Sequence, residues 1–477
     1  MITEQLFIAG KWSAAKATLP VEDPSTGEII GTLAAGTADD VDAAVAAAQA
    51  AYSGAWGKLT AAERGRVLAR IGKAVEARAD ELAQLEARDV GKPLKQARAD
   101  ALALARYLEF YAGAADKLHG ETIPYLAGYT VFTLREPHGV TAHIIPWNYP
   151  MQIIGRSVVG ALAAGNATVV KPAEEASLTA LAFARIAHEA GLPPGALNVV
   201  TGTGEQAGAA LAAHPGVHHV SFTGSTAVGA LIQAAAGQNA VPVTLELGGK
   251  SPQIVFADAD MERALPFLVN AGIQNAGQTC SASSRLLVER TIYEPLLEKL
   301  SARYRALRVG AARDDLDVGP LISAAQKARV EKYIAHGRGD GLTIAAEGAI
   351  ASNAPRGGHF LAPTLFAGVA PDHLLAQDEI FGPVQVVIPF SSEDEAIQIA
   401  NGTQYGLVAG VWTRDGGRAM RLTRAVHAGQ VFINNYGAGG GVELPFGGVG
   451  RSGHGREKGF EALYAFTRLK TVAAFHG

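Results

Sequence analysis

Cysteine is almost missing from this chain. Cys280 is the only one among 477 residues, so no disulfide can form within the chain. A lack of disulfides fits a reducing compartment. Residues 1–6 also lack the basic and apolar regions of a secretory signal. We therefore expect a cytoplasmic protein.

A large excess of charge is also missing. Lys and Arg number 41, Asp and Glu number 45, and the formal net charge is −4. This balance does not favour a nucleic-acid or membrane-surface partner, so neither is expected. The longest apolar stretch, residues 153–170, contains Arg156 and Asn166 and is a poor membrane span. Hydrophobic residues make up 48% of the chain, which is enough for a large core, and the length predicts two or three domains.

The pattern of the remaining residues predicts an α/β protein. Residues 38–118 are rich in alanine, with charges at helical spacing, and are expected to be helical. Beyond about residue 139, β-branched runs alternate with amphipathic stretches. The expected strands are 167–170, 197–200, 217–222 and 243–247, and the expected helices are 177–190 and 205–213. Such alternation is typical of a doubly wound parallel sheet, and a second set of α/β signals follows from 260 to 434.

Cys280 lies among loop-forming residues rather than in a hydrophobic stripe. Its neighbours Gly277, Gln278, Thr279 and Ser281 are typical of a loop or the start of a helix. A helix N-terminus favours the thiolate, which makes this a suitable position for a nucleophile. The alternative is a buried cysteine that acts only as a small hydrophobic residue.

Two short motifs after predicted strands suggest a bound nucleotide. Gly224 and Ser225 open a predicted helix, where backbone amides can hold a phosphate. Lys171 and Glu174 follow the strand 167–170, at the sheet edge where such folds bind ligands, and the glutamate could accept bonds from ribose hydroxyls. The alternatives are a glycine-bearing turn without a ligand and a solvated turn with a capping glutamate.

Two further polar residues stand in unusual places. Glu246 lies inside an apolar strand, between Leu245 and Leu247, so it is either paired or functional. Asn148 lies between Pro146 and Pro150, in a rigid turn that would aim its amide at one spot. An ordinary Asx turn is the alternative for Asn148.

Taken together, the motifs resemble the NAD(P)-dependent aldehyde dehydrogenase superfamily. The matching segments are 146–150 (PWNYP), 171–174 (KPAE), 222–225 (FTGS), 245–250 (LELGGK), 277–280 (GQTC), 379–383 (EIFGP) and 445–448 (PFGG). Their order and spacing cover nearly the whole chain. The resemblance implies an NAD-binding domain (1–118 and 138–248) with the doubly wound sheet, an α/β catalytic domain (249–447), and a small β oligomerisation arm and tail (119–137 and 448–477). The arm would join subunits into a homodimer or homotetramer.

The resemblance also implies roles for single residues. Cys280 would be the nucleophile, Glu246 the general base, and Asn148 with the Cys280 backbone N–H the oxyanion hole. The cofactor would be NAD, with NADP possible, and no metal is expected. Its expected contacts are Ile144, Pro146, Trp147, Lys171, Glu174, Gly204, Phe222, Gly224, Ser225, Val228, Leu247, Gln326, Glu379 and Phe381, together with Arg329. The expected substrate residues are Tyr149, Arg156, Thr279, Ser281 and Gly440.

The implied reaction oxidises an aldehyde to a carboxylic acid. The Cys280 thiolate would form a thiohemiacetal, loss of hydride would leave a thioester, and water deprotonated by Glu246 would release the acid. A free thiol has a pKa of about 8.5, so we expect the site to lower it. One alternative is acyl transfer to coenzyme A, although branches with that chemistry usually lack a glutamate at position 246. Another is a binding or structural protein of the same fold.

The substrate is indicated only by class. Arg156 follows Asn148 by eight residues, on the helix expected to line the substrate tunnel. It would attract a carboxylate, or else form a structural ion pair. Glycines at 437 and 439–441 leave room where the tunnel should open. We therefore expect a small-molecule substrate that is a bulky aldehyde, aromatic or carrying a carboxylate.

Overall fold

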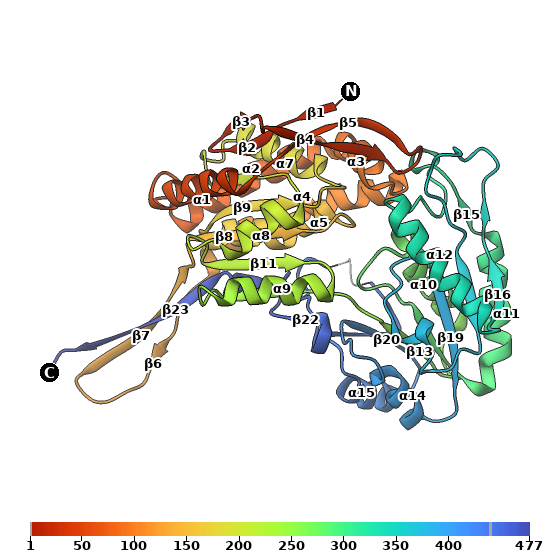
Figure 1. Ribbon diagram of the computed structural model, residues 1–477. Helices are drawn as coiled ribbons and strands as arrows, with labels where there is room; N and C mark the ends of the chain where they lie inside the picture. Colours follow the sequence, from red (N-terminus) through yellow and green to blue (C-terminus); the bar gives the residue numbers. More distant parts are fainter. Residues whose placement is uncertain (1, 438–440) are drawn as a thin grey trace.

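The first of two large sheets contains the predicted doubly wound unit (Figure 1). The computed structural model describes residues 2–437 and 441–477. Eight strands are ordered β22-β12-β11-β8-β9-β10-β2-β3, and the central five are parallel. Their bounds are β8 (Val140–Ile145), β9 (Ala167–Pro172), β10 (Leu197–Val199), β11 (His219–Thr223) and β12 (Val243–Glu246). The antiparallel edges are β2 (Leu6–Ile8), β3 (Lys11–Ser13) and β22 (Gly453–His454).

The strand order creates a ligand-binding crevice. β8 is central, with β9 on one side and β11 on the other, so the chain changes direction across the sheet at β8. Open α/β sheets bind ligands outside the carboxyl ends of the strands at such a point. Asn148 follows β8, Ser225 follows β11, and Glu246 ends β12.

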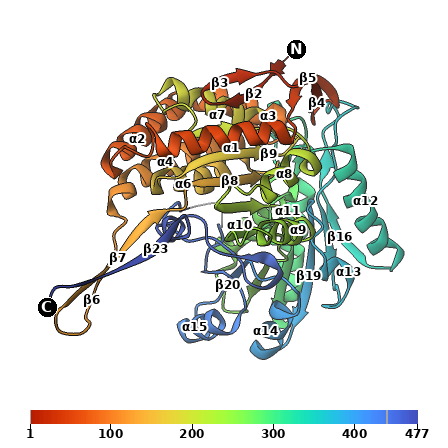
Figure 2. The same cartoon turned by 60° about the vertical axis from the view of Figure 1, so that its left-hand side comes forward.

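Helices cover this sheet on both faces. The alanine-rich region forms α1 (Ala38–Ser53), α2 (Ala61–Ala77), α3 (Ala79–Val90) and α4 (Leu94–Ala114), as predicted. Of these, α2, α3 and α4 pack together, whereas α1 packs on β8, β9 and β10 with α8 (Ala209–Ala213) (Figure 2). Small residues allow the close packing, since a Cβ at Gly65 of α2 would lie 2.5 Å from the Ala112 carbonyl oxygen of α4. The later helices are α5 (Pro150–Ile153), α6 (Val159–Ala164), α7 (Leu178–Glu189), α8 (Ala209–Ala213) and α9 (Thr226–Gly237).

The second large sheet has seven strands, ordered β16-β18-β19-β14-β13-β20-β21. All neighbours pair in parallel except β16 at one edge. The strands are β13 (Pro252–Val255), β14 (Arg285–Glu289), β16 (Thr343–Glu347), β18 (Thr364–Ala367), β19 (Val384–Phe390), β20 (Val408–Trp412) and β21 (Gln430–Ile433). The helices are α10 (Met261–Ile273), α11 (Tyr293–Ala306), α12 (Ala324–Gly339), α13 (Leu374–Gln377), α14 (Glu393–Asn401) and α15 (Gly416–Ala425). The second α/β unit is therefore present.

Two small sheets complete the body. One has the order β1-β5-β4, and the other pairs β15 with β17. Their bounds are β1 (Ile2–Glu4), β4 (Ala17–Asp23), β5 (Glu28–Ala35), β15 (Arg308–Val309) and β17 (Ala349–Ile350). None of the described helices is long and apolar enough to cross a membrane.

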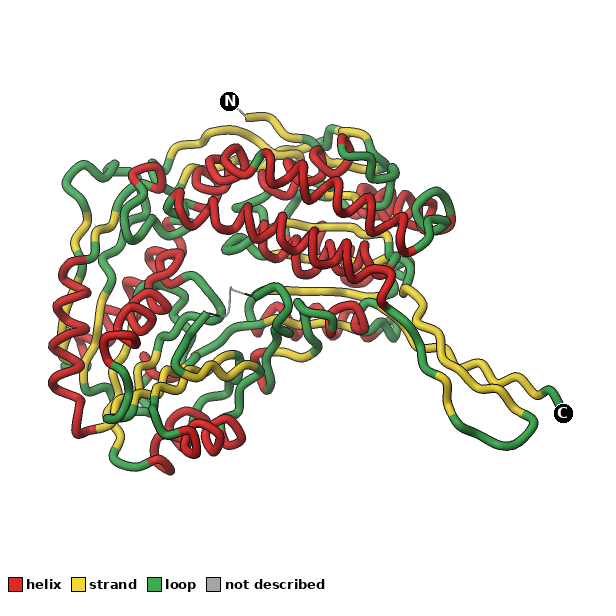
Figure 3. The backbone as a smooth tube through the Cα atoms, turned by 180° about the vertical axis from the view of Figure 1, so that it is seen from behind, coloured by secondary structure: helices red, strands yellow, loops and turns green. Residues whose placement is uncertain are grey.

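A three-stranded antiparallel arm projects from the body, with the C-terminus near its tip (Figures 1 and 3). It consists of β6 (Thr122–Ile123), β7 (Tyr129–Pro137) and β23 (Thr467–Phe475). The prediction that all of 448–477 belongs with the arm needs correction. β22 extends the first sheet beside β12, and α16 (Glu461–Ala465) buries Ala462 and Leu463 in the first core. These apolar side chains hold the first part of the tail against the body.

Candidate active site

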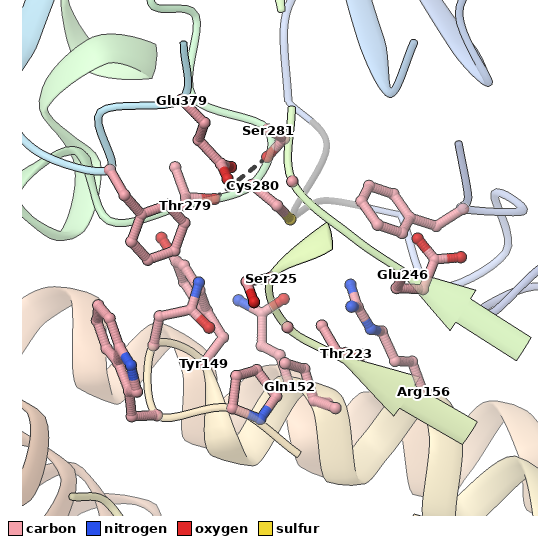
Figure 4. A pocket seen from close by; sticks show the side chains of 18 of the residues that line it. Tyr149, Gln152, Arg156, Thr223, Ser225, Glu246, Thr279, Cys280, Ser281 and Glu379 are labelled. Atoms are coloured by element: carbon pink, nitrogen blue, oxygen red, sulfur yellow. Dashed lines mark hydrogen bonds between the residues drawn. The ribbon is translucent and has the colours of Figure 1, made fainter. Parts of the chain in front are cut away.

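A cavity lies at the crevice predicted by the strand order (Figure 4). Its walls come from the segments that follow β8, β11 and β12 and from the loop that carries Cys280. Cys280, Glu246 and Asn148 all line it. The three predicted catalytic residues, which are far apart in sequence, therefore share one cavity.

Cys280 is held by a strained loop, not by the start of a helix. The 3₁₀ turn Gln274–Gly277 follows α10, and Cys280 lies in the turn after it, so the predicted helix N-terminus is wrong. Asn275 and Ala276 have φ values of 50° and 55°, a conformation that residues with a side chain rarely adopt. Gly277 is required at φ 72°, because a Cβ there would lie 2.1 Å from the Gly382 carbonyl oxygen.

The thiol of Cys280 is not activated in the way the sequence suggested. Burial raises its pKa to about 12, although the nearby Arg156 guanidinium acts in the opposite direction. The expectation of a lowered pKa is therefore not met in this structure. The physical reason is that the loop offers no helix dipole, while the carboxylates of Glu379 and Glu246 add to the effect of burial.

Asn148 is fixed beside the same loop. Its Nδ2 donates to the Gln278 carbonyl oxygen at 3.0 Å, and Asn275 Nδ2 donates to the Asn148 carbonyl oxygen at 3.0 Å. Gln278 in turn accepts from the Ile322 backbone N–H at 2.9 Å. This network locks the turn after β8 to the cysteine loop, so the amide of Asn148 can serve as a preorganised donor.

Glu246 is buried, and neither of its carboxylate oxygens has a hydrogen-bond partner within the described part of the chain. Burial and the nearby Glu457 raise its pKa well above the usual value, while Arg156 opposes them. A carboxylate with a raised pKa is a better proton acceptor than an exposed one. The environment therefore suits a general base.

Arg156 forms the ion pair that was one of its two interpretations, and its role toward a substrate stays a prediction. Its Nε lies 2.5 Å from Glu457 Oε2, and its guanidinium lies 4.8 Å from the centre of the Phe446 ring. The structural ion pair is therefore present. Its Nη2 is buried without a hydrogen-bond partner among the described residues, and the side chain lines the cavity beside Glu246 (Figure 4). The ion-paired cation therefore also belongs to the cavity wall.

Half of the predicted cofactor residues also line the cavity. Trp147 and Phe381 face each other across it, with ring centres 5.3 Å apart in an edge-to-face arrangement. Gln326 Nε2 donates to the Phe381 carbonyl oxygen, and Arg329 donates to that of Glu379, each at 2.7 Å. The expected cofactor residues in the cavity wall are Pro146, Trp147, Gly224, Ser225, Gln326, Glu379 and Phe381, with Arg329.

The predicted cofactor residues Lys171, Glu174, Gly204 and Val228 lie outside the cavity wall. Lys171 Nζ pairs with Glu174 Oε2 at 2.8 Å, and the Gly204 backbone N–H donates to the other oxygen of Glu174 at 3.5 Å. Ser225 caps α9 by accepting from the backbone N–H of Val228. The Val228 side chain is 43% exposed, so an apolar surface adjoins the helix start.

These features fit a dinucleotide. The start of α9 offers amides for a pyrophosphate, and the pair Lys171–Glu174 offers a carboxylate for ribose hydroxyls. Gly248 allows the Glu379 carboxylate to approach, because a Cβ there would lie 2.2 Å from Glu379 Oε2. Burial raises the pKa of Glu379 to about 7. A half-buried carboxyl in the cavity wall is a suitable partner for hydroxyl groups.

Three further predicted cofactor contacts have buried side chains away from the cavity wall, and one predicted substrate residue lies outside the described residues. Ile144, Phe222 and Leu247 are buried in the first core and do not line the cavity. The Leu247 side chain packs on Gly229 of α9 instead. These side chains are buried because alternate residues of a strand, or of the segment that extends it, point into the interface between the sheet and its helices. Gly440 lies outside the described residues.

The remaining substrate residues line the cavity together with residues that the sequence did not reveal. Tyr149, Thr279 and Ser281 are present in its wall, and Lys92 Nζ lies 3.9 Å above the centre of the Tyr149 ring. The additional lining residues are Tyr107, Gln152, Ile153, Thr223, Gly248, Gln274, Phe446 and Lys458. Gln152 precedes Arg156 by about one turn of the same helical segment, so the spacing could have identified it. Lys458 had no such signal.

Comparisons with known proteins identify the family. Residues 12–472 match the aldehyde dehydrogenase family. The chain is 46% identical over 474 residues to the mitochondrial aldehyde dehydrogenase family 2 member B4 of Arabidopsis thaliana, which covers 98% of this chain and 87% of that protein. The crystal structure of a putative aldehyde dehydrogenase from Burkholderia cenocepacia is 64% identical, with a TM-score of 0.99, and covers 99% of this chain and 100% of its own.

A further solved structure holds a ligand. It is the NAD⁺ complex of an aldehyde dehydrogenase from Bacillus cereus, which is 39% identical, with a TM-score of 0.97, and covers 100% of this chain and 97% of its own. The match of the family model over nearly the whole chain and the agreement of the complete fold lead to one conclusion: this chain belongs to the aldehyde dehydrogenase family.

Proposed function

We propose that the protein oxidises a bulky aldehyde, aromatic or carrying a carboxylate, to the carboxylic acid with NAD⁺ as the cofactor. The observation that carries the proposal is the convergence of Cys280, Asn148 and Glu246 on one cavity whose wall also contains the Arg156 guanidinium. The NAD⁺ complex of the Bacillus cereus relative supports the choice of cofactor. When bound, NAD⁺ supplies the hydride acceptor.

Cys280 is the nucleophile in this scheme. Burial raises the pKa of the Cys280 thiol, which favours its protonated form. The thiol must therefore give up its proton to a base as the sulfur attacks the aldehyde carbon. Glu246, whose own pKa is raised, is the acceptor in the same cavity. The Asn148 amide and the backbone N–H of Cys280 stabilise the negative oxygen that forms, and one such donor is worth roughly 2.7–4 kcal/mol.

Glu246 also acts in the second half of the reaction. It removes a proton from the water that attacks the thioester and releases the acid. Water must lose a proton to attack the thioester, so a base in this cavity supports hydrolysis over transfer to coenzyme A. The binding-only alternative would be supported by loss of one of the three catalytic residues, and all three are present.

Arg156 and Gln152 give the cavity its polarity. Gln152 Nε2 donates to the buried Asp100 carboxylate at 2.5 Å, which fixes the amide at the cavity wall. Arg156 places a cation close to Glu246 and Cys280. A charge-assisted bond to a substrate carboxylate would add roughly 1.5–3 kcal/mol, or about one to two decades in kcat/KM.

An aldehyde panel tests the proposal. The rate of NADH formation is measured with acetaldehyde, propanal, benzaldehyde and 4-carboxybenzaldehyde, each with and without coenzyme A. Either aromatic aldehyde should exceed acetaldehyde clearly in kcat/KM, without any need for coenzyme A. Acetaldehyde or propanal as the best substrate would contradict the proposed substrate class, and strict dependence on coenzyme A would contradict hydrolysis.

The arm supports the proposal of a homodimer or homotetramer. Tyr125, Leu126, Leu469 and Phe475 are exposed apolar side chains on it, and β6 and β23 form its edges. Unpaired strand edges and apolar faces are commonly covered by a second subunit. Light scattering at micromolar concentration should give two or four times the chain mass of 49.4 kDa, and a monomer would refute the proposal.

A further inference from the structure

Two histidines and an aspartate converge on the surface of the second α/β unit. Nε2 of His336 lies 3.2 Å from Asp340 Oδ2, and Nε2 of His373 lies 3.1 Å from the same oxygen. All three ligand atoms lie within 4.8 Å of one another. His336 and Asp340 are one turn apart at the C-terminal end of α12, whereas His373 caps α13.

This cluster ends a series of contacts between α12 and the segment 373–381. Gln326 binds the Phe381 carbonyl oxygen, Arg329 that of Glu379, and Tyr333 donates to Asp378 at 3.1 Å. The next turn of α12 presents His336 and Asp340 to His373. A ligand bound there would fix the start of the segment whose other end carries Glu379 and Phe381 in the cavity wall.

We propose that His336, Asp340 and His373 form a binding site for a divalent transition metal of the zinc class. Imidazole nitrogen and carboxylate oxygen are typical zinc ligands, and three protein ligands leave one position for water. Ligands about 2.0–2.1 Å from a tetrahedral ion lie about 3.3–3.4 Å apart. Two of the three separations, 3.1 and 3.2 Å, are close to that value.

Binding requires a small local change. His373 Nδ1 accepts a hydrogen bond from the Leu375 backbone N–H at 3.1 Å. Coordination through Nε2 places the ring proton on Nδ1, which can then no longer accept. The metal therefore replaces the cap of α13, a helix of four residues, with a direct link to α12.

Isothermal titration with Zn²⁺ tests the site on the full-length chain after removal of metals with a chelator. The Cys280→Ala variant is titrated so that the thiol does not compete, and His336→Ala, Asp340→Asn and His119→Ala are each added to that background. His119 is an exposed histidine outside the cluster and is the matched control. Thermal unfolding with and without Zn²⁺ provides a readout that does not depend on activity.

The expected result is one Zn²⁺ per chain in the Cys280→Ala background, with the same affinity in the His119→Ala control. Mutation of residues that only hydrogen-bond to the metal ligands typically lowers metal affinity by about 10–100-fold. Loss of a ligand itself should therefore weaken Zn²⁺ binding by at least about tenfold. Zn²⁺ should raise the unfolding temperature of the parent and not that of His336→Ala. Absence of binding, or binding unchanged by both cluster variants, would overturn the proposal.

Discussion

Replacement of Arg156 by leucine should separate its two roles. Arg156 and Glu457 are both buried, and Glu457 Oε1 accepts one further bond, from Ser221 Oγ at 2.9 Å. Removing one partner of a buried pair typically costs about 3–5 kcal/mol, because the other charge is left unpaired. We expect a loss of stability near the lower of these values, because Ser221 still donates a hydrogen bond to the Glu457 carboxylate in the variant. The contact with the Phe446 ring adds roughly 0.5–2 kcal/mol.

The double variant Arg156→Leu/Glu457→Gln should recover most of that loss. A neutral amide can still accept from Ser221 and leaves no buried charge. Urea unfolding of the wild type, both single variants and the double variant gives the coupling energy of the pair. A coupling near zero would mean that the ion pair contributes nothing.

The stable double variant then tests substrate recognition. The ratio of kcat/KM for 4-carboxybenzaldehyde to that for benzaldehyde should fall by about one to two decades, since a charge-assisted bond worth roughly 1.5–3 kcal/mol is lost. Glu457→Gln alone keeps the guanidinium and serves as the control, with little change in the ratio. An unchanged ratio in the double variant would refute the role of Arg156 as an anion anchor and leave it a purely structural residue.

Four further predictions concern the catalytic residues, the cofactor and stability. Cys280→Ala should abolish NADH formation while calorimetry still detects NAD⁺ binding; residual turnover would argue for another nucleophile. Glu246→Gln should slow the release of the acid more than the first burst of NADH, although both need the base. Because burial raises the pKa of Glu246, the acid limb of wild-type kcat/KM should lie above about pH 4.5 and disappear in the variant; equal losses of burst and steady state would speak against the second role. NAD⁺ should be preferred over NADP⁺ in kcat/KM, because the ionised Glu174, whose pKa Lys171 lowers against the effect of burial, repels a 2′-phosphate. Burial raises the pKa of Asp89 to about 8, so folding favours its protonated form, and this contribution to stability is lost as the pH rises from about 4 to 8. Asp89→Asn should therefore raise the free energy of unfolding at pH 8 by about 1–3 kcal/mol, after subtraction of the favourable interaction of the carboxylate with the start of α7. A variant less stable than the wild type at pH 8 would contradict this.

The sequence identified the order of elements and the chemistry of the site, because these depend on local patterns. Alternating β-branched and amphipathic stretches predicted the strands from β9 to β12, and alanine with spaced charges predicted the helices of 38–118. Polar residues in places that a core does not tolerate, such as Glu246 in a strand, identified candidate site residues. Seven motifs in register indicated the family, which the comparisons confirm.

Only the tertiary structure decided how the ionisable side chains affect one another. The loop at Cys280 follows a helix rather than opening one, and the burial that raises its pKa depends on side chains from both halves of the molecule. Arg156 reaches Glu457, and His373 reaches α12, through contacts between segments far apart in the chain. Desolvation and ion pairing depend on three-dimensional proximity, and a local sequence pattern does not contain that information.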